Sequence, residues 1–423
     1  MIARRFPSPA ARRAGSRRAS AAALALAVVL AAAGPLAPGP VRAQAASPVT
    51  AASPVGQDAA GALARLFAAA TFDAAWFTPA LLAELPVKRL AGQRDELVAQ
   101  YGAFRRAERD GDKWTVVLAR ARVPTRIAFD PRGRVRSLNF ERPIPIPESL
   151  AKAVAAFDAL PAARTLLILD DGRERAAREP DRPLGVGSAV KMLVLREYAA
   201  AIAAGRLRAD QVVGLEPGWK APGSGMIGTW ADGTPVALGT LATMMISISD
   251  NTATDALMHV IGRRALDAAA PPRNRPLMTT RELHLLRLHR DPEALARWRS
   301  GDVAAREAVL AALPEGRALA PVWGEILASD VDYLFTAREL CALAAAVGER
   351  PEMRANPGPA ASLGWSWAAY KGGSTDTSIN ATLLLGKDAR QVCVAATWNV
   401  SPHIDRARFM AVVRGLLGAL AAE

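Results

Sequence analysis

Strand-like runs stand at both ends of the larger part of this chain, and a long helical stretch separates them. The early runs are 165–169 and 174–178, and the late runs are 368–371, 380–385 and 391–398, before a terminal helix over 405–420. Early and late strands can share one sheet only if the chain returns on itself, so the pattern predicts an antiparallel sheet built from both ends. Residues 148–423 are therefore expected to form an α+β domain, in which helices flank this sheet beside an all-helical part.

A smaller unit is predicted before that domain, over residues 56–142. Apolar spacing from Ala59 to about Tyr101 indicates helices. Short strand-like runs separated by turn signals follow at 103–109, 114–120, 126–129 and 135–140. Three prolines within 143–147 then mark a boundary. Helices followed by an antiparallel meander predict a small α+β domain.

The N-terminus has the pattern of an export signal. Residues 1–43 hold seven arginines and no acid, and an apolar run from Ala21 to Ala33 precedes the small-x-small site Val41-Arg42-Ala43. We expect a signal peptide over 1–43, a linker over 44–55, and a periplasmic or secreted protein. An uncleaved anchor is the alternative, and only in that case is a membrane partner expected.

The formal charge of +13 is concentrated in that segment, because the rest of the chain holds 46 basic and 40 acidic residues. The remaining surplus is spread along the chain with no basic cluster beside aromatic residues. This distribution argues against a nucleic-acid partner.

Cysteine and histidine are scarce and show no metal-ligand spacing. Cys341 and Cys393 lie in apolar stretches, where an oxidising compartment would permit a bridge and two buried thiols are an equal alternative. We expect no metal and no cofactor. No role is evident for the four histidines His259, His284, His289 and His403.

Three short motifs fall in the larger domain, in the order Ser188-Ala189-Val190-Lys191, Ser249-Asp250-Asn251 and Lys371-Gly372-Gly373. Together they correspond to the S-x-x-K, S-D-N and K-T-G set that the β-lactamases and penicillin-binding proteins use for catalysis. Each motif is weak alone, since Ser-Asp-Asn before a helix is also a good N-cap and Lys-Gly-Gly is often a turn.

The first motif supplies a nucleophile and a base. Ser188 follows a glycine-rich turn and precedes a helical run, so its backbone N–H lies near a helix N-terminus, where a developing oxyanion is stabilised. Lys191 stands one turn later on the same face, among apolar residues that would lower its pKa. The chain has only seven lysines against 46 arginines, and two of the seven fall in these motifs. Lysine, unlike arginine, can act as a base.

The other two motifs predict the proton relay and the substrate contacts. The Ser249 hydroxyl is expected to pass a proton to the leaving group, and Asn251 offers its amide to the substrate. Lys371 would bind a substrate carboxylate beside Gly373, and the backbone N–H of Ser374 would be the second oxyanion donor.

With these motifs, residues 148–423 resemble the serine β-lactamase and penicillin-binding protein superfamily. Three further stretches carry the resemblance, namely Gly223-Ser224-Gly225-Met226-Ile227, Ile246-Ser247-Ile248-Ser249-Asp250-Asn251-Thr252-Ala253 and Tyr333-Leu334-Phe335-Thr336-Ala337-Arg338-Glu339-Leu340. The two-domain layout is similar to that of the esterase-like proteins of clavulanic acid biosynthesis, which implies a steroid-isomerase-like fold for residues 56–142.

Two departures from the family pattern bear on turnover. The Glu-x-x-Leu-Asn loop, whose glutamate activates the deacylating water in class A β-lactamases, is replaced by a mostly helical insert over 275–332. Glu325 is the nearest acid there, in the wrong register for that base. Gly372 also stands where these enzymes carry Ser or Thr, so a hydroxyl for the substrate carboxylate is missing, and Ser374 or Thr375 would have to replace it.

The sequence therefore predicts an exported serine hydrolase that forms an acyl-enzyme on β-lactam, ester or D-alanyl-peptide-like small molecules. One alternative is a covalent penicillin-binding or sensor protein without efficient turnover. A Ser-His-Asp hydrolase is a second alternative, disfavoured because no G-x-S-x-G surrounds Ser188 or Ser224.

Overall fold

The computed structural model describes residues 59–423 except 111–112, 148, 289–290, 315–325 and 327. The predicted signal peptide and linker, as well as Glu325 and His289, lie outside the described residues. The described residues all belong to one compact unit. The domain boundary expected at 143–147 stays a prediction.

The larger sheet has the strand order β12-β13-β14-β6-β7, and every neighbouring pair is antiparallel. Its strands are β6 (Ala163–Asp170), β7 (Arg173–Arg178), β12 (Trp367–Ser374), β13 (Ser378–Lys387) and β14 (Arg390–Asn399). The C-terminal strand β14 pairs directly with the early strand β6, from Val392 opposite Asp170 to Asn399 opposite Ala163. The predicted sheet built from both chain ends is therefore confirmed.

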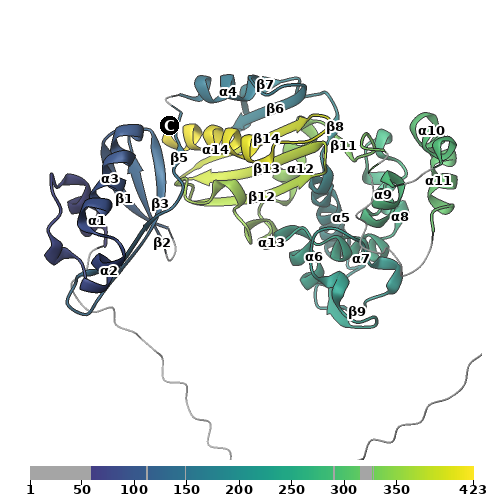
Figure 1. Ribbon diagram of the computed structural model, residues 1–423. Helices are drawn as coiled ribbons and strands as arrows, with labels where there is room; N and C mark the ends of the chain where they lie inside the picture. Colours follow the sequence, from purple (N-terminus) through teal and green to yellow (C-terminus); the bar gives the residue numbers. More distant parts are fainter. Residues whose placement is uncertain (1–58, 111–112, 148, 289–290, 315–325, 327) are drawn as a thin grey trace, which may run out of the picture. The chain divides into compact units, whose positions relative to one another are not determined.

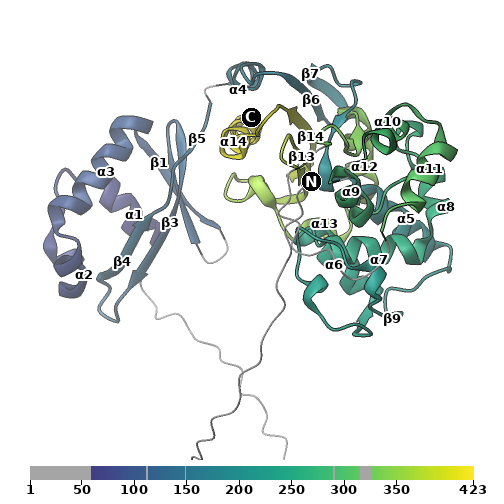
Figure 2. The same ribbon diagram turned by 45° about the vertical axis from the view of Figure 1, so that its right-hand side comes forward.

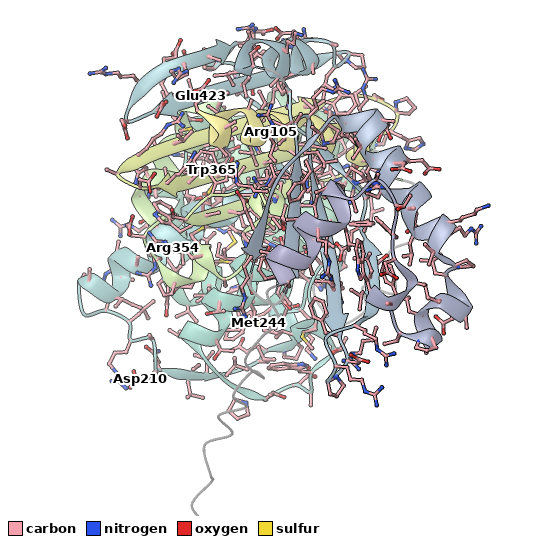
Figure 3. All side chains as sticks on the ribbon, turned by 90° about the vertical axis from the view of Figure 1, so that its left-hand side faces the viewer. Arg105, Asp210, Met244, Arg354, Trp365 and Glu423 are labelled. Carbon is pink, nitrogen blue, oxygen red and sulfur yellow. A yellow bond between two sulfur atoms is a disulfide. The ribbon has the colours of Figure 1, made fainter. Side chains whose placement is uncertain are left out.

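Helices cover both faces of this sheet (Figure 1). On one face α14 (Arg406–Ala422) packs on α4 (Leu150–Asp158) and β13, and on the other α12 (Ala337–Val347) packs on β6, β13 and β14. Two separate apolar cores result, one on each face. Side chains fill the space between sheet and helices, and Glu423 ends α14 (Figure 3). The predicted α+β arrangement is the observed one.

A mostly helical part lies beside the sheet (Figure 2). It was expected to be all-helical, but it also contains the short antiparallel pair of β9 (Val212–Gly214) and β10 (Pro235–Ala237). Its principal helices are α5 (Lys191–Ala203), α6 (Leu238–Ser247), α7 (Asn251–Ile261), α8 (Arg263–Ala269), α9 (Thr280–Arg287), α10 (Pro292–Ser300) and α11 (Val303–Ala311). The α7 helix is almost wholly buried and packs on α5, α6, α8 and α9. It therefore forms the centre of this part.

The N-terminal residues form helices α1 (Ala59–Ala68), α2 (Pro79–Glu84) and α3 (Val87–Tyr101), then a meander of β1 (Phe104–Asp110), β2 (Lys113–Leu118), β3 (Ala121–Phe129) and β4 (Val135–Phe140). Their apolar core is drawn wholly from residues 63–140. The strand expected over 126–129 is longer than predicted, because it begins at Ala121 and continues through Pro124. The β5 strand (Ile144–Pro145) pairs with its start.

Cys341 of α12 and Cys393 of β14 form a disulfide bond. Of the two alternatives open for these cysteines, the bridge is the observed one. It ties the helix to the strand that joins the two chain ends. No helix in the described part of the chain is long and apolar enough to span a membrane.

Candidate active site

The predicted nucleophile lies on a short turn at the edge of the larger sheet. Ser188 belongs to the 3-10 turn η2 (Gly187–Val190), between β8 (Leu184–Gly185) and α5. The turn begins at Gly187, whose φ of +51° is a left-handed conformation that glycine adopts at low cost. Buried side chains of α5 anchor the helix that follows. Ser188 is thereby held on a rigid element and faces the cleft described below.

Lys191, one turn after Ser188, is fully buried. Its Nζ lies 2.7 Å from Asn251 Oδ1, 2.6 Å from the Ser249 carbonyl oxygen and 3.2 Å from Ser249 Oγ. Burial lowers the pKa of Lys191 well below its ordinary value, and the charge of Lys371 lowers it further. The lowered pKa favours the neutral amine, which is the form of lysine that can accept a proton from a hydroxyl.

Ser249 joins the three motifs. Its Oγ lies 3.2 Å from Lys191 Nζ and accepts a hydrogen bond from Lys371 Nζ at 2.9 Å. Its φ of +60° is unusual for a residue with a side chain, and such strain is held where the surrounding structure fixes it. The hydroxyl is therefore placed to pass a proton between two amines.

The rest of the second motif is divided between structure and site. Asp250 caps α7 by accepting from the Ala253 N–H at 2.9 Å, and it also accepts from the backbone of Met226 and Ile227. The N-cap interpretation of Ser-Asp-Asn therefore applies to Asp250. Asn251 instead presents its amide to the cleft and donates to the Pro222 carbonyl at 2.5 Å.

The third motif lies on β12, pressed against the nucleophile turn. A Cβ placed on Gly373 would come within 2.0 Å of the Val186 carbonyl oxygen and 2.5 Å of the Ser188 nitrogen. Across the same contact, a Cβ on Gly187 would lie 2.9 Å from the Ser374 nitrogen. The Ser188 and Ser374 amides, expected to form the oxyanion hole, thus lie on two segments in backbone contact.

Tyr370 fills the space that a side chain at Gly372 would occupy. A Cβ there would fall 2.1 Å from the Tyr370 hydroxyl oxygen. Thr375, one of the proposed replacements for the missing hydroxyl, hydrogen-bonds Ser378 Oγ at 2.8 Å and two backbone N–H groups of its own turn. Thr375 lines the cleft together with Tyr370 and Ser374, but its hydroxyl is used within its own turn.

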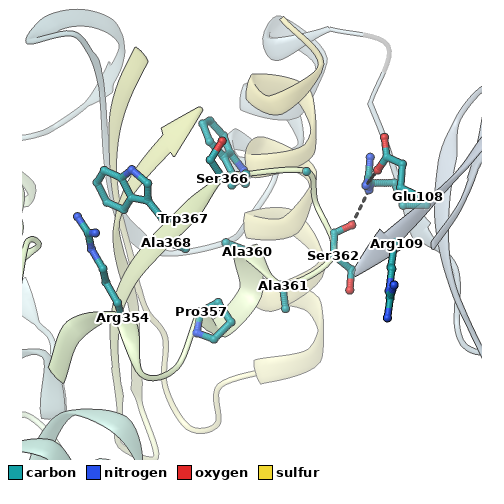
Figure 4. Close-up of a pocket in the computed structure, with 13 residues that line it drawn as sticks. Glu108, Arg109, Arg354, Pro357, Ala360, Ala361, Ser362, Ser366, Trp367 and Ala368 are labelled. Carbon is teal, nitrogen blue, oxygen red and sulfur yellow. Dashed lines mark hydrogen bonds and ion pairs between the residues drawn. The ribbon is translucent and has the colours of Figure 1, made fainter. Parts of the chain in front are cut away.

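The start of β12 is fixed by a neighbouring helix. The Arg354 guanidinium, at the end of α13 (Pro351–Arg354), lies 4.2 Å from the ring centroid of Trp367 (Figure 4). Such a cation–π contact holds the first residue of the strand that carries Lys371.

A buried carboxylate supports the nucleophile turn from behind. Asp332 accepts from the Gly187 N–H at 2.9 Å, from the Tyr333 N–H at 2.7 Å and from Ser378 Oγ at 2.6 Å. Burial raises its pKa, while these hydrogen bonds lower it. Asp332 thus links the turn that carries Ser188 to the first residue of β13, and no sequence motif indicates this role.

These side chains surround a cleft of about 870 Å³. Ser188, Ser249, Asn251, Lys371, Gly373 and Ser374 line it. Burial lowers the pKa of Lys371 to about 7. Among the described residues, no group of three or more His, Cys, Asp or Glu side chains could hold a metal ion.

The helical insert over residues 275–332, which replaces the Glu-x-x-Leu-Asn loop, contributes α9 to the cleft wall. Thr280, Leu283, His284 and Arg287 of this helix line the cleft. Asp255 of α7 positions the helix by accepting from the Thr280 N–H and Oγ1, each at 2.7 Å. The spacing Thr280-x-x-Leu283-His284 parallels Glu-x-x-Leu-Asn, with threonine in place of glutamate and histidine in place of asparagine. That parallel was the signal that could have identified His284.

A fully buried lysine one helical turn after Ser188 is hydrogen-bonded to Ser249, at the edge of an antiparallel sheet beside a helical part. This arrangement is typical of the β-lactamase-like serine hydrolases. Among the described residues, the side chain in polar contact with His284 is Asn251, rather than a serine or an aspartate. This contact differs from the arrangement in a Ser-His-Asp hydrolase.

Residues 148–285 match the model of the beta-lactamase enzyme family. This match confirms the resemblance to the serine β-lactamase and penicillin-binding protein superfamily. No curated protein matches the chain.

Solved structures similar to the chain include a β-lactamase from Sphaerobacter thermophilus, at 21% identity and a TM-score of 0.45, covering 64% of this chain and 95% of that one. A β-lactamase from Xanthomonas campestris has 15% identity and a TM-score of 0.44, covering 64% and 96%. The penicillin-binding protein PBP-A has 14% identity and a TM-score of 0.45, covering 66% and 98%. The likeness to the beta-lactamase enzyme family rests on the match over residues 148–285 and on the motifs.

Proposed function

We propose that this protein is an exported serine hydrolase that forms an acyl-enzyme through Ser188. The observation that carries the proposal is the placement of the Ser249 hydroxyl between Lys371 and Lys191, the lysine that follows Ser188 by one helical turn. In this scheme neutral Lys191 accepts the Ser188 proton as Oγ attacks the carbonyl carbon. Ser249 then delivers a proton to the leaving nitrogen or oxygen.

The substrate class follows from the charges of the cleft. Lys371, and Arg406 at the start of α14, are cations that favour a substrate carboxylate. The Ser188 and Ser374 N–H groups would stabilise the oxyanion of the tetrahedral intermediate. We therefore propose β-lactam, ester or D-alanyl-peptide-like substrates that carry a carboxylate.

Export to the periplasm or the medium is part of the same proposal. The basic and apolar N-terminal segment supports it, as does the Cys341–Cys393 disulfide, because such bonds persist in oxidising compartments.

Intact-protein mass spectrometry with a fluorescent penicillin and a chromogenic cephalosporin tests the proposal. We expect an acyl adduct on Ser188 that is lost in Ser188→Ala. The matched control is Ser247→Ala, because Ser247 also lines the cleft but donates its hydroxyl to the Thr243 carbonyl. Labelling that survives in Ser188→Ala would refute the assignment of the nucleophile.

A second candidate function is a covalent penicillin sensor that acylates without turnover. The scarcity of acidic side chains in the cleft favours this function. Asp376 is the one carboxylate among the described residues that line the cleft, and it is paired with Arg287. A stable Ser188 adduct over hours would support the sensor, whereas a transient adduct with product release would support the hydrolase.

A further inference from the structure

Turnover of an acyl-enzyme needs a base beside the ester bond, and α9 presents few groups that can serve. The Thr280 hydroxyl donates to Asp255 at 2.7 Å, and Leu283 is apolar. Arg287 is a buried cation bound to Asp376 and to the Val331 carbonyl at 2.7 Å. His284 is the remaining cleft-lining side chain of this helix, and its imidazole has a nitrogen lone pair.

The position of His284 connects it to the predicted catalytic residues. Its Nε2 lies 3.5 Å from Asn251 Nδ2, and Asn251 Oδ1 accepts from Lys191 Nζ at 2.7 Å. Because the Asn251 amide nitrogen carries only N–H groups, the imidazole proton is assigned to Nδ1 and the lone pair to Nε2. Asn251 Nδ2 donates to the Pro222 carbonyl at 2.5 Å, and its 3.5 Å contact with Nε2 is longer than an ordinary hydrogen bond, so the Nε2 lone pair is left for another donor. A water molecule bound between Nε2 and the Ser188 ester would complete the arrangement.

The charges around His284 keep its imidazole neutral. Burial lowers the pKa of His284 to about 4, and the positive charge of Arg287 on the same helix contributes. The other groups packed against the ring, Asn251 of α7 and the backbone at Gly223, carry no charge. The lone pair is therefore available at neutral pH.

We propose that His284 is the general base of deacylation, a role that rests on the proposed acylation of Ser188. The water oxygen attacks the acyl carbonyl carbon while Nε2 takes one water proton, which gives a tetrahedral oxyanion and an imidazolium. Collapse breaks the bond between the carbonyl carbon and Ser188 Oγ, and Oγ takes the proton from the imidazolium. The products are a carboxylic acid, free Ser188 and neutral His284.

This role sets the rate and its dependence on pH. A base with a pKa near 4 is weak at neutral pH, so deacylation is expected to be slow and to limit turnover. The deacylation rate should be constant above about pH 5 and should fall as the imidazole is protonated near pH 4.

The test compares His284→Gln and His284→Ala with wild type, using the fluorescent penicillin and the chromogenic cephalosporin. Mass spectrometry follows the rise and the decay of the Ser188 adduct separately. The matched control is His259→Gln, because His259 lies on the exposed side of α7 with its ring stacked on Trp219. We expect acylation to stay within about twofold and deacylation to slow about 100-fold in both His284 variants, the lower end for a lost general base.

Two further readouts separate a base from a packing residue. Imidazole added to the buffer should restore part of the deacylation rate in His284→Ala, and the acid limb near pH 4 should disappear in His284→Gln. Unchanged deacylation in both variants, or a permanent adduct in wild type, would overturn the role of His284 while leaving Ser188 acylation intact. Absence of any Ser188 adduct in wild type would instead overturn the proposed function, and with it this role.

Discussion

A methyl group at position 373 should separate β12 from the nucleophile turn. The Cβ of Gly373→Ala would lie 2.0 Å from the Val186 carbonyl oxygen, whereas real Cβ contacts essentially never fall below 3.0 Å. The obstacle is backbone rather than a flexible side chain, so the strand must retreat by about 1 Å. A misplacement of about 1 Å can cost roughly 100-fold in rate. We therefore expect the acylation rate to fall at least that far.

Stopped-flow labelling with a fluorescent penicillin measures that rate, and circular dichroism checks that the variant folds. Gly218→Ala is the control, because a Cβ at Gly218 meets nothing within 4 Å. Acylation of Gly373→Ala at the wild-type rate, or an equal loss in Gly218→Ala, would refute the argument that backbone contact between the two segments positions the reacting groups.

Four further predictions concern charge and stability. Lys371 is a cation below about pH 7 and neutral above it, so KM for a carboxylate-bearing penicillin should rise above pH 7; an equal rise for an uncharged ester would contradict this. Between pH 7 and 10.5 Lys371 is neutral in the folded protein but protonated in the unfolded chain. The unfolded chain therefore binds more protons, and Lys371 makes the free energy of unfolding rise with pH in that window. Asp332→Ala leaves buried donors without an acceptor, at about 1–3 kcal/mol each, which urea unfolding should detect. Replacing both Cys341 and Cys393 by alanine should lower the free energy of unfolding by about 4 kcal/mol for a loop of this length, and a reductant should then have no further effect.

The larger sheet could be predicted because its strands are apolar runs bounded by clear turns. The N-terminal meander was harder, since Pro124 has no N–H and interrupts the strand pattern. In the structure its carbonyl accepts from the Glu141 N–H, so β3 continues through it at the loss of one donor. The pairing of β8 with β11 (Leu334–Phe335) involves two residues on each strand, which is too short to give a periodic signal.

The candidate site was predictable where the chemistry is encoded in short motifs, and not where it depends on packing. The spacing within each motif indicated Ser188, Lys191 and Lys371. The role of His284 depends instead on which face of α9 meets the cleft. Asp255, 25 residues before Thr280, fixes that face by capping the helix, and no local pattern shows such a contact. The same holds for Asp332, which lies 145 residues from Gly187.

The pairing of β6 with β14 also governs how the chain can be made and delivered. A ribosome must synthesise almost the entire polypeptide before the strand opposite residues 163–170 exists, and such distant pairings form slowly. A nascent chain therefore stays open and inactive while it is still attached to the ribosome. If the proposed export holds, that delay would leave the chain unfolded for passage through a translocation pore.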